Sequence, residues 1–332
     1  MNIHIMSLAN QLGSRVKLLD VDLQFMAGTT KLFSFSPDED VVEIACRLAE
    51  RILNQHNIAL SQISGVFGSS NASFETLLPT LTTVFASRLG LRKVIADHIG
   101  LGCAGGVQSL RNCYNQLCVD FMQGKQDSYY LVIVGDQTNR ILDETNRRTN
   151  LLFSEAVSVL LVTNDQLVDS GYRINRIGTK SLLTNLDVMR INNPYCTNQI
   201  EKFEMDGKRV FRFAVESFPD ILSTVDMNHF GKDKFYFIPH QANLRIINSL
   251  IEREGLDKDL VYNRGIQNYG NTSGSAVFCG LEDALRQNLF DKDLEILLGA
   301  FGAELQVGGV CLSQLNLEKF LLTGGQDGLP QD

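Results

Sequence analysis

The chain has 332 residues, of which 44% are hydrophobic and 20% are charged, and its formal net charge is −8. This balance is typical of a globular protein, and the negative charge argues against general binding to nucleic acid, which requires a basic surface. No stretch approaches the roughly 18 unbroken apolar residues of a membrane span, so we expect no membrane association.

The N-terminal sequence MNIHIMSLANQLG lacks the basic start, the long apolar block and the cleavage site of a secretory signal, so we expect a cytoplasmic location. The cysteines are odd in number and irregularly spaced, in a chain long enough to build a large core, so we expect no disulfide framework. No pair of them has the spacing of zinc ligands, and no metal site is predicted.

The first half of the chain shows a regular succession of apolar strands and helical segments. The apolar run ISGVFGSSN (63–71) reads as a buried strand, and LLPTLTTVFASRLG (77–90) has a helical pattern. A short strand, a glycine turn and a second helix follow in KVIADHIGLGCAGGVQSLRN (93–112). Two further strands are expected at YYLVIVG (129–135) and VSVLLV (157–162), which completes one unit.

The second half repeats the same order of elements. Its segments are KFYFIPHQAN (234–243), LRIINSLIEREG (244–255), VYNRGIQNYGNTSGSAVFCGLEDAL (261–285), LEILLGAFG (294–302) and GVCLSQL (309–315). In this comparison Cys103 and Asn271 occupy the same position, at the turn between a short strand and a helix. The alternation of strands and helices predicts two similar α/β halves, each with a largely parallel sheet covered by helices on both faces.

The repeat divides the chain into four parts. We predict an N-terminal half over residues 1–165 and a C-terminal half over residues 226–320. Residues 166–225 hold fewer clear signals and are expected to form a bridge or cap near a pocket. The glycine-rich tail 321–332 is expected to be flexible.

Cys103 lies between glycines just before a predicted helix, where the helix dipole and the free backbone N–H groups stabilise a thiolate. The apolar stripe of that helix is complete without Cys103 and consists of Val107, Leu110, Tyr114, Leu117 and Phe121. A single cysteine in a turn of small residues is more often a packing residue than a nucleophile. The other candidate residues therefore decide whether Cys103 is interpreted as a packing residue or as a nucleophile.

His240 ends a predicted strand, and Asn271 lies at a strand-to-helix turn. Each has a structural explanation of its own, because a lone histidine is often buried in a core and asparagine is common in caps and turns. In a parallel α/β sheet, however, the loops after the strands gather at the carboxyl edge, where ligands bind. A thiol, an imidazole and an amide collected there could transfer an acyl group and stabilise an oxyanion.

Four segments carry a resemblance to a known family. They are IGLGCAGG (99–106), IPHQANLRI (238–246), NYGNTSGSA (268–276) and LLGAFGAELQVGG (297–309). With them the sequence resembles the thiolase-fold condensing enzymes, and most closely the β-ketoacyl-acyl-carrier-protein synthase III family. The resemblance covers nearly the whole chain, and it implies a homodimer with a five-layered α/β/α/β/α core made of two duplicated halves.

The resemblance also implies the chemistry. Cys103 would take an acyl group from a thioester, with the backbone N–H groups of Cys103 and Ala303 forming the oxyanion hole. His240 and Asn271 would bind the carbonyl oxygen of a malonyl-type thioester and stabilise the enolate formed by decarboxylation. The substrates would be thioesters of coenzyme A or acyl carrier protein, in fatty-acid-like or polyketide-type biosynthesis, with no bound cofactor.

Several positions depart from the family pattern. The turn around Ala303 reads FGAE instead of an FGGG-like sequence, and Leu78 stands where the family commonly has an aromatic residue that reaches into the partner subunit's acyl tunnel. Arg245 matches the basic residue that contacts the acidic carrier protein. The chain has no tryptophan, GTTKLFSF (28–35) replaces the usual Gly-Ile-x-x-Arg signature, and FSEAVSVLLV (153–162) replaces a glycine-rich segment.

Other functions remain open from the residues. The acyl-enzyme could pass its acyl group to an alcohol, an amine or another acceptor without decarboxylation, although Asn271 argues mildly against this. The chain could also be a non-catalytic partner subunit of a related synthase, which the presence of Cys103, His240 and Asn271 disfavours. A thiolase proper would need a second catalytic cysteine in a C-terminal turn. It is less favoured, because Cys311 lies in the last predicted strand and reads as a core residue.

Overall fold

The centre of the molecule is a mixed β-sheet. The structure is a computed structural model that describes residues 1–22, 24, 28–70, 78–100, 102–142, 151–168, 170–183, 186–191, 203–302, 305–318 and 320–321. In these ranges nine strands form one sheet, in the order β11-β12-β13-β8-β1-β7-β6-β4-β5. Their bounds are β1 His4–Leu12, β4 Ile63–Ser69, β5 Ile95–Ile99, β6 Tyr129–Asp136, β7 Ala156–Thr163, β8 Tyr172–Ser181, β11 Phe235–Pro239, β12 Glu295–Gly302 and β13 Gln306–Gln314.

The sheet consists of two halves with the same topology. In the N-terminal half β1 is antiparallel to β7, β7 is antiparallel to β6, and β6, β4 and β5 are parallel. In the C-terminal half β8, β13, β12 and β11 repeat these directions, and an isolated parallel bridge between Phe237 and Val261 takes the place of β5. The duplication expected from the sequence is therefore confirmed.

The prediction of a largely parallel sheet is wrong. Within the described nine-stranded sheet, five strand pairings are antiparallel: β1 with β7, β1 with β8, β6 with β7, β8 with β13 and β12 with β13. A parallel pair needs a crossover of about a dozen residues or more. Gly302 and Gln306, which end β12 and begin β13, are too close in the sequence for such a crossover.

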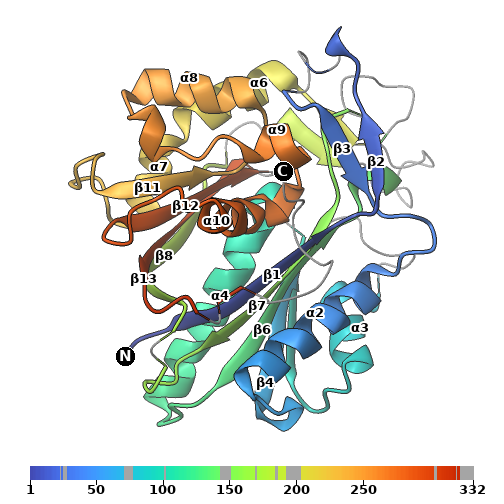
Figure 1. Ribbon diagram of the computed structural model, residues 1–332, viewed down its shortest axis with the longest axis vertical. Helices are drawn as coiled ribbons and strands as arrows, with labels where there is room; N and C mark the ends of the chain where they lie inside the picture. The colour runs from blue at the N-terminus through green and yellow to red at the C-terminus, as the bar shows by residue number, and fades with distance from the viewer. Residues whose placement is uncertain are drawn as a thin grey trace.

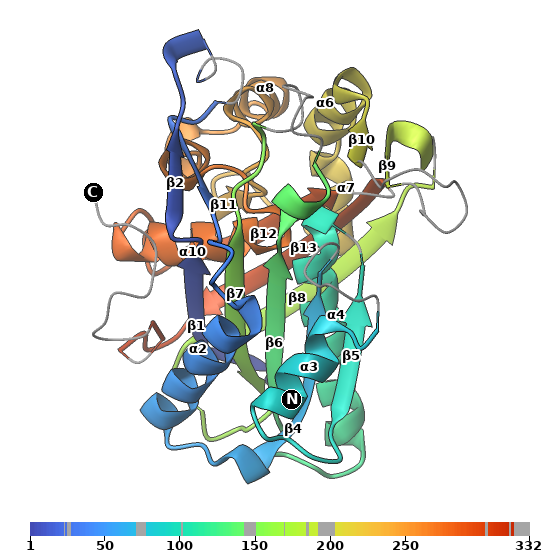
Figure 2. The ribbon, with the colours of Figure 1, turned by 90° about the vertical axis from the view of Figure 1, so that its right-hand side faces the viewer.

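The helices form three layers around the two half-sheets (Figure 1 and Figure 2). Helices α2 (Val41–His56) and α3 (Leu81–Arg88) pack on the outer face of the N-terminal half. Helices α4 (Gly105–Met122) and α10 (Ala276–Arg286) lie between the halves. The outer face of the C-terminal half is covered by α6 Gly207–Glu216, α7 Phe218–Thr224 and α8 Leu244–Glu254. The expected five-layered α/β/α/β/α arrangement is thus confirmed.

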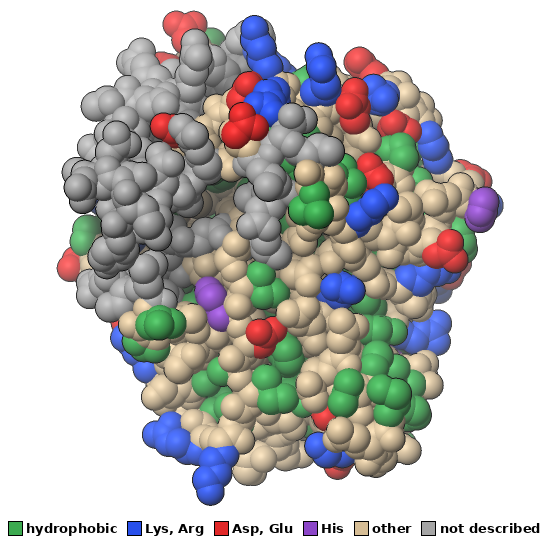
Figure 3. Space-filling model, turned by 180° about the vertical axis from the view of Figure 1, so that it is seen from behind, with side chains coloured by type: hydrophobic (Ala, Val, Ile, Leu, Met, Phe, Trp, Pro, Cys, Tyr) green, Lys and Arg blue, Asp and Glu red, His purple; other side chains and the backbone are tan. Residues whose placement is uncertain are grey.

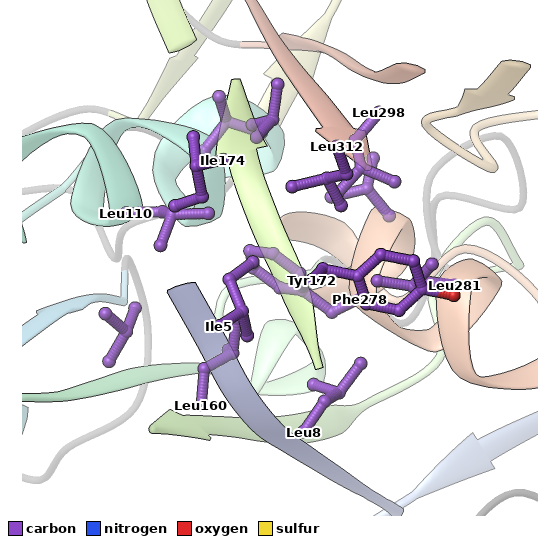
Figure 4. Close-up of a cluster of buried hydrophobic side chains, with 14 of the residues drawn as sticks. Ile5, Leu8, Leu110, Leu160, Tyr172, Ile174, Phe278, Leu281, Leu298 and Leu312 are labelled. Carbon is purple, nitrogen blue, oxygen red and sulfur yellow. The ribbon is translucent and has the colours of Figure 1, made fainter. Parts of the chain in front are cut away.

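Strand β6 shows why the sheet needs a helical layer on each face. Val132 and Val134 belong to the central core with α4 and α10, whereas Leu131 and Ile133 belong to the outer core with α2 and α3. Successive side chains of a strand point to opposite faces, so an uninterrupted apolar run buries both of them. Figure 4 shows the central core, in which side chains from β1, β8, α4 and α10 meet.

The remaining described elements are short. The α-helix α9 spans Gly265–Tyr269, and two separate ribbons are formed by β2 (Arg15–Leu18) with β3 (Lys31–Ser34) and by β9 (Met189–Ile191) with β10 (Phe203–Met205). The 3-10 helices are η1 Leu60–Gln62, η2 Gly102–Ala104, η3 Thr138–Arg140, η4 Leu186–Val188, η5 Lys258–Leu260 and η6 Ser273–Ser275. None of the helices described by the structure is long and apolar enough to cross a membrane.

The structure bears on two of the expected parts of the chain, the bridge 166–225 and the tail 321–332. Residues 166–225, expected as a bridge, contain β8, which pairs with both β13 and β1 in the sheet. We therefore place β8 with the C-terminal half, while the division near residue 165 stays a prediction. The expected tail lies outside the described residues from position 322 onward.

Candidate functional site

Three loops bring the chemically interesting side chains to one cavity. Cys103 lies in η2 just before α4, His240 directly follows β11, and Asn271 precedes η6. All three line a cavity of about 720 Å³. Cys103 comes from the N-terminal half of the fold and the other two come from the C-terminal half, so the site is built where the halves meet.

The thiol of Cys103 is held against a serine of the other half. Its Sγ lies 3.7 Å from Oγ of Ser273. Burial raises the pKa of the Cys103 thiol to about 12, and the hydrogen bond with Ser273 acts in the opposite direction. The backbone of Gly302 packs on the same loop, since a Cβ atom there would lie 3.1 Å from the Cys103 nitrogen and 2.7 Å from that of Ala104.

His240 is only 1% exposed, and its backbone N–H donates to the carbonyl of Gly299 over 2.7 Å. Its ring packs edge-on against Phe301, with ring centroids 5.1 Å apart. Burial lowers the pKa of His240 to about 3, so the imidazole is neutral near pH 7. Among the described residues its buried Nδ1 has no hydrogen-bond partner.

Asn271 is 5% exposed and fixed on two sides. Its side-chain Oδ1 accepts a hydrogen bond of 2.9 Å from the backbone N–H of Ser273, and its carbonyl accepts one of 2.8 Å from Ser154. Because Oδ1 already has a partner, the Nδ2 amino group is what Asn271 can offer to a ligand in the cavity. The geometry therefore leaves Nδ2 of Asn271 able to donate a hydrogen bond to an oxygen in the cavity.

The loops that carry Cys103 and Asn271 pack directly on each other through glycines. A Cβ atom on Gly106 would lie 2.4 Å from the carbonyl oxygen of Gly274. A side chain at Gly106 would therefore keep the two helix starts from approaching this closely. Gly274 donates its N–H to Asp136 over 3.4 Å, and the Ser275 hydroxyl donates to the Val134 carbonyl over 3.2 Å. These contacts tie the Asn271 loop to the end of β6.

The cavity wall is mostly apolar, with charged groups among its lining residues on α6 and α8. The apolar lining residues are Leu152, Phe153, Met189, Met205, Val210, Phe211, Ile246 and Phe301. Asp206 caps α6 by accepting from the backbone N–H groups of Lys208 and Arg209. Lys208 and Arg245 also line the cavity, and both are exposed. A ligand with an apolar part inside and a polar or anionic part outside fits this arrangement.

Two of the predicted site residues are not placed in the cavity by the structure. Leu78 is 77% exposed and is not among the described residues that line the cavity. Ala303, expected in the oxyanion hole, lies outside the described residues. Arg245, in contrast, lies in the first turn of α8 beside the cavity.

The segments that depart from the family pattern have defined positions. Gly28 lies close to the start of α8, since a Cβ atom there would be 3.1 Å from the nitrogen of Leu244. In β7 the hydroxyl of Ser158 donates to Asn10, whose amide in turn donates to Glu282 over 2.6 Å. The polar Ser158 is thus accommodated by a buried hydrogen-bonded network between β1, β7 and α10.

Sequence reasoning did not single out Ser273, Phe301 or Asp136. Ser273 and Phe301 lie inside the motifs that contain Asn271 and Ala303. Ser273 contacts Cys103 and Phe301 contacts His240, and each contact joins segments far apart in the chain. Asp136 ends a strand of apolar residues and could have been noticed as a charged group at the carboxyl end of β6. Within the described part of the chain, no cluster of three metal-ligating side chains is present.

The chain is similar to known proteins over most of its length. Residues 231–313 match the family model of the 3-oxoacyl-acyl-carrier-protein synthase III C-terminal part. The chain is 25% identical over 280 residues to a β-ketoacyl-acyl-carrier-protein synthase III of Clostridium novyi, with 82% of this chain and 84% of that protein covered. It is 28% identical over 270 residues to the enzyme of that name from Pectobacterium atrosepticum, which covers 80% of this chain and 82% of the relative.

Solved structures show the same fold. The 3-oxoacyl-(acyl carrier protein) synthase III of Pseudomonas aeruginosa superposes with a TM-score of 0.83 at 21% identity, covering 96% of this chain and 99% of that one. A priming β-ketosynthase from a polyketide biosynthetic pathway superposes with a TM-score of 0.79 at 21% identity, covering 94% and 96%. The fold of nearly the whole chain therefore agrees with the resemblance carried by the four sequence segments.

Proposed function

We propose that the chain is a divergent member of the β-ketoacyl-acyl-carrier-protein synthase III family and, from this premise, that it is a condensing acyltransferase. It loads an acyl group from a thioester onto Cys103 and joins it to a malonyl-type thioester by decarboxylative Claisen condensation, in fatty-acid or polyketide biosynthesis. The observation that carries this proposal is the joint lining of one apolar cavity by Cys103, His240 and Asn271.

In the first step the Cys103 sulfur attacks the carbonyl carbon of the acyl thioester. A bond from Sγ to the acyl carbon forms, the bond to the donor sulfur breaks, and the thiol proton leaves with the donor thiol. The negative charge on the carbonyl oxygen needs donors fixed in advance. We assign this role to the backbone N–H groups of Cys103 and Ala303.

In the second step the malonyl-type thioester loses carbon dioxide. The electrons of the broken carbon–carbon bond form an enolate, whose oxygen is stabilised by donors from His240 and Asn271. A neutral imidazole suits this task because it donates a hydrogen bond without adding a charge to a buried site. The enolate carbon then attacks the acyl group on Cys103 and releases the thiolate.

Lys208 and Arg245 at the cavity support a phosphopantetheine-bearing substrate. Both are cationic and exposed, while the wall behind them is apolar. An acidic carrier protein would be attracted to such a place. We propose that Arg245 contacts the carrier protein and that acyl carrier protein or coenzyme A thioesters are the substrates, with no bound cofactor.

We further propose a homodimer that forms at the β5 edge of the sheet, and a cytoplasmic location. Strand β5 ends the sheet, Ile95 on it is 39% exposed, and Met122 on the neighbouring α4 is 76% exposed. Figure 2 shows β5 and α4 on one side of the molecule, and Figure 3 shows hydrophobic side chains exposed on that side. An unpaired strand edge with apolar neighbours is a ready surface for a second copy.

The test begins with intact mass spectrometry of purified protein incubated with a panel of acyl-coenzyme A and acyl-carrier thioesters. The wild type and Cys118→Ala, a control on the half-buried cysteine of α4, should gain the acyl mass, and Cys103→Ala should not. A malonyl thioester is then added, and carbon dioxide release is measured. An acyl adduct without carbon dioxide release would favour transfer to another acceptor, and no adduct from the whole panel would favour a non-catalytic subunit.

A further inference from the structure

Ser273 connects two of the site residues and has no role in the reaction described so far. Its hydroxyl is the hydrogen-bonding group placed 3.7 Å from the Cys103 sulfur, although the two residues are 170 positions apart in the chain. Its backbone N–H donates to Oδ1 of Asn271 over 2.9 Å. Ser273 is 3% exposed, so water does not compete freely for these contacts. One residue thus contacts the nucleophile and orients the amide.

The backbone of Ser273 is held in an unusual conformation. Its φ of 52° lies in the left-handed region that residues other than glycine rarely adopt. Such strain persists only where the surroundings hold it, and it is concentrated at functional sites. Here the holding contacts are the hydrogen bonds of Gly274 to Asp136 and of Ser275 to Val134. Extended backbone at this position would move the hydroxyl away from the thiol.

The reaction creates a need for a hydrogen-bond donor at this point. Negative charge develops on Sγ when Cys103 attacks the acyl donor and again when the condensed product leaves it. Burial raises the pKa of the Cys103 thiol, which means that the protein around the sulfur disfavours the anion. His240 is neutral because burial lowers its pKa, so it supplies no positive charge to balance the thiolate.

We propose that Ser273 is a catalytic residue whose hydroxyl donates a hydrogen bond to the Cys103 sulfur whenever negative charge develops on it. The inference rests on the proposed function of Cys103 as the acyl-accepting nucleophile. No proton is transferred to or from the serine: the thiol proton leaves with the departing donor thiol, and Ser273 keeps its own. In the resting thiol the same hydroxyl oxygen can accept the S–H hydrogen bond instead.

A donor to a charged group contributes more than one to a neutral group. Removing the hydroxyl should therefore slow acylation of Cys103 by about 10-fold to 100-fold. At each pH below the thiol pKa it should also lower the rate of alkylation by about tenfold, because a rise of one unit in that pKa lowers the thiolate fraction tenfold. A role limited to packing would leave the alkylation rate unchanged.

The experiment compares the wild type with Ser273→Ala, Ser273→Gly and Ser109→Ala. Glycine removes the hydroxyl and also accepts the positive φ without strain, so Ser273→Gly keeps the test valid if the alanine variant folds poorly. Ser109→Ala is the matched control, because it removes a buried serine hydroxyl on α4 that has no hydrogen-bond partner among the described residues. The rate at which iodoacetamide alkylates Cys103 is measured against pH by peptide mass spectrometry, followed by single-turnover acylation.

We expect both Ser273 variants to lower the alkylation rate and to slow acylation, with Ser109→Ala equal to the wild type. An unchanged alkylation rate in both Ser273 variants would overturn the inference. Alkylation needs no substrate, so it separates this inference from the proposed function. A lowered alkylation rate in Ser273 variants of a protein that accepts no acyl group would support the role of Ser273 as a donor to the thiolate and would contradict only the condensing activity.

Discussion

At the scale of single residues, the site is built from groups that are neutral at rest. Burial raises the pKa of Cys103 to about 12 and lowers that of His240 to about 3, so the pair is not a thiolate and an imidazolium. This differs from cysteine nucleophiles that are activated by a charged histidine. In the proposed reaction, hydrogen-bond donors instead stabilise the negative charge where it appears.

The neutrality of His240 predicts the pH dependence of decarboxylation. The folded pKa of about 3 lies below the ordinary value of 6.5, so the imidazole stays uncharged as the pH falls through 6.5. Carbon dioxide release by the pre-acylated enzyme should therefore show no titration step of a histidine between about pH 5 and 8. A loss of activity with a midpoint near 6.5, absent from acylation, would contradict this.

Asn271 should act in decarboxylation and not in acylation. The substitution Asn271→Asp keeps an oxygen for the Ser273 N–H but removes the amino group that donates to the enolate. We expect carbon dioxide release to fall by about 100-fold to 1,000-fold, as for the loss of one oxyanion donor. Acylation of Cys103, followed by intact mass, should stay within a few-fold. Asn268→Asp in the same segment is the control, and an equal loss in both reactions would show general damage to the loop.

At the scale of elements, the site depends on how closely two helix starts approach. The loops before α4 and α10 contact each other at Gly106 and Gly274, and the Cys103 and Asn271 loops are held together by that contact. The sequence shows the small residues at both turns, and the apolar pattern of each helix, because these are local features. It does not show that the two turns face each other, which depends on packing between halves of the chain.

The substitution Gly106→Ala should test this contact. Its Cβ atom would lie 2.4 Å from the backbone carbonyl oxygen of Gly274, which cannot move away as a flexible side chain could. We expect the free energy of unfolding to fall by about 1–3 kcal/mol, the usual cost of overpacking, and the acylation rate to fall as well. Urea unfolding measures the first. Gly207→Ala, whose Cβ would meet nothing within 4 Å, should leave stability close to the wild type.

Strand direction was the feature of the elements that the sequence did not predict. Continuous apolar runs such as those of β6 and β7 indicate strands buried on both faces, but they carry no information on which neighbour is antiparallel. The roles of Cys103, His240 and Asn271 were proposed from motifs. Ser273 escaped notice because its contact with the thiol follows from a left-handed backbone conformation that the letters TSG do not specify.

At the scale of the whole molecule, the exposed edge at β5 predicts an assembly. Ile95→Lys places a charge on the edge strand and should convert the proposed dimer into a monomer, because a charged side chain on an edge blocks strand pairing. Sedimentation velocity measures the change. Leu167→Lys, at a side chain that is 91% exposed after β7, is the control and should keep the wild-type mass. Equal sedimentation of both variants and the wild type would place the interface elsewhere.

The two half-sheets are joined at β1 and β8 by a short stretch, with His4 opposite Arg173 and Ile5 opposite Tyr172. Their relative orientation therefore depends chiefly on the helices between them, where Val107 of α4 and Phe278 of α10 belong to one core. Cys103, the proposed nucleophile, moves with one half, and His240 and Asn271 move with the other. Changes of side-chain volume in this middle layer would tune the alignment of the reacting atoms while every residue that touches the substrate stays the same, which makes the layer a place where new specificities can arise at a distance.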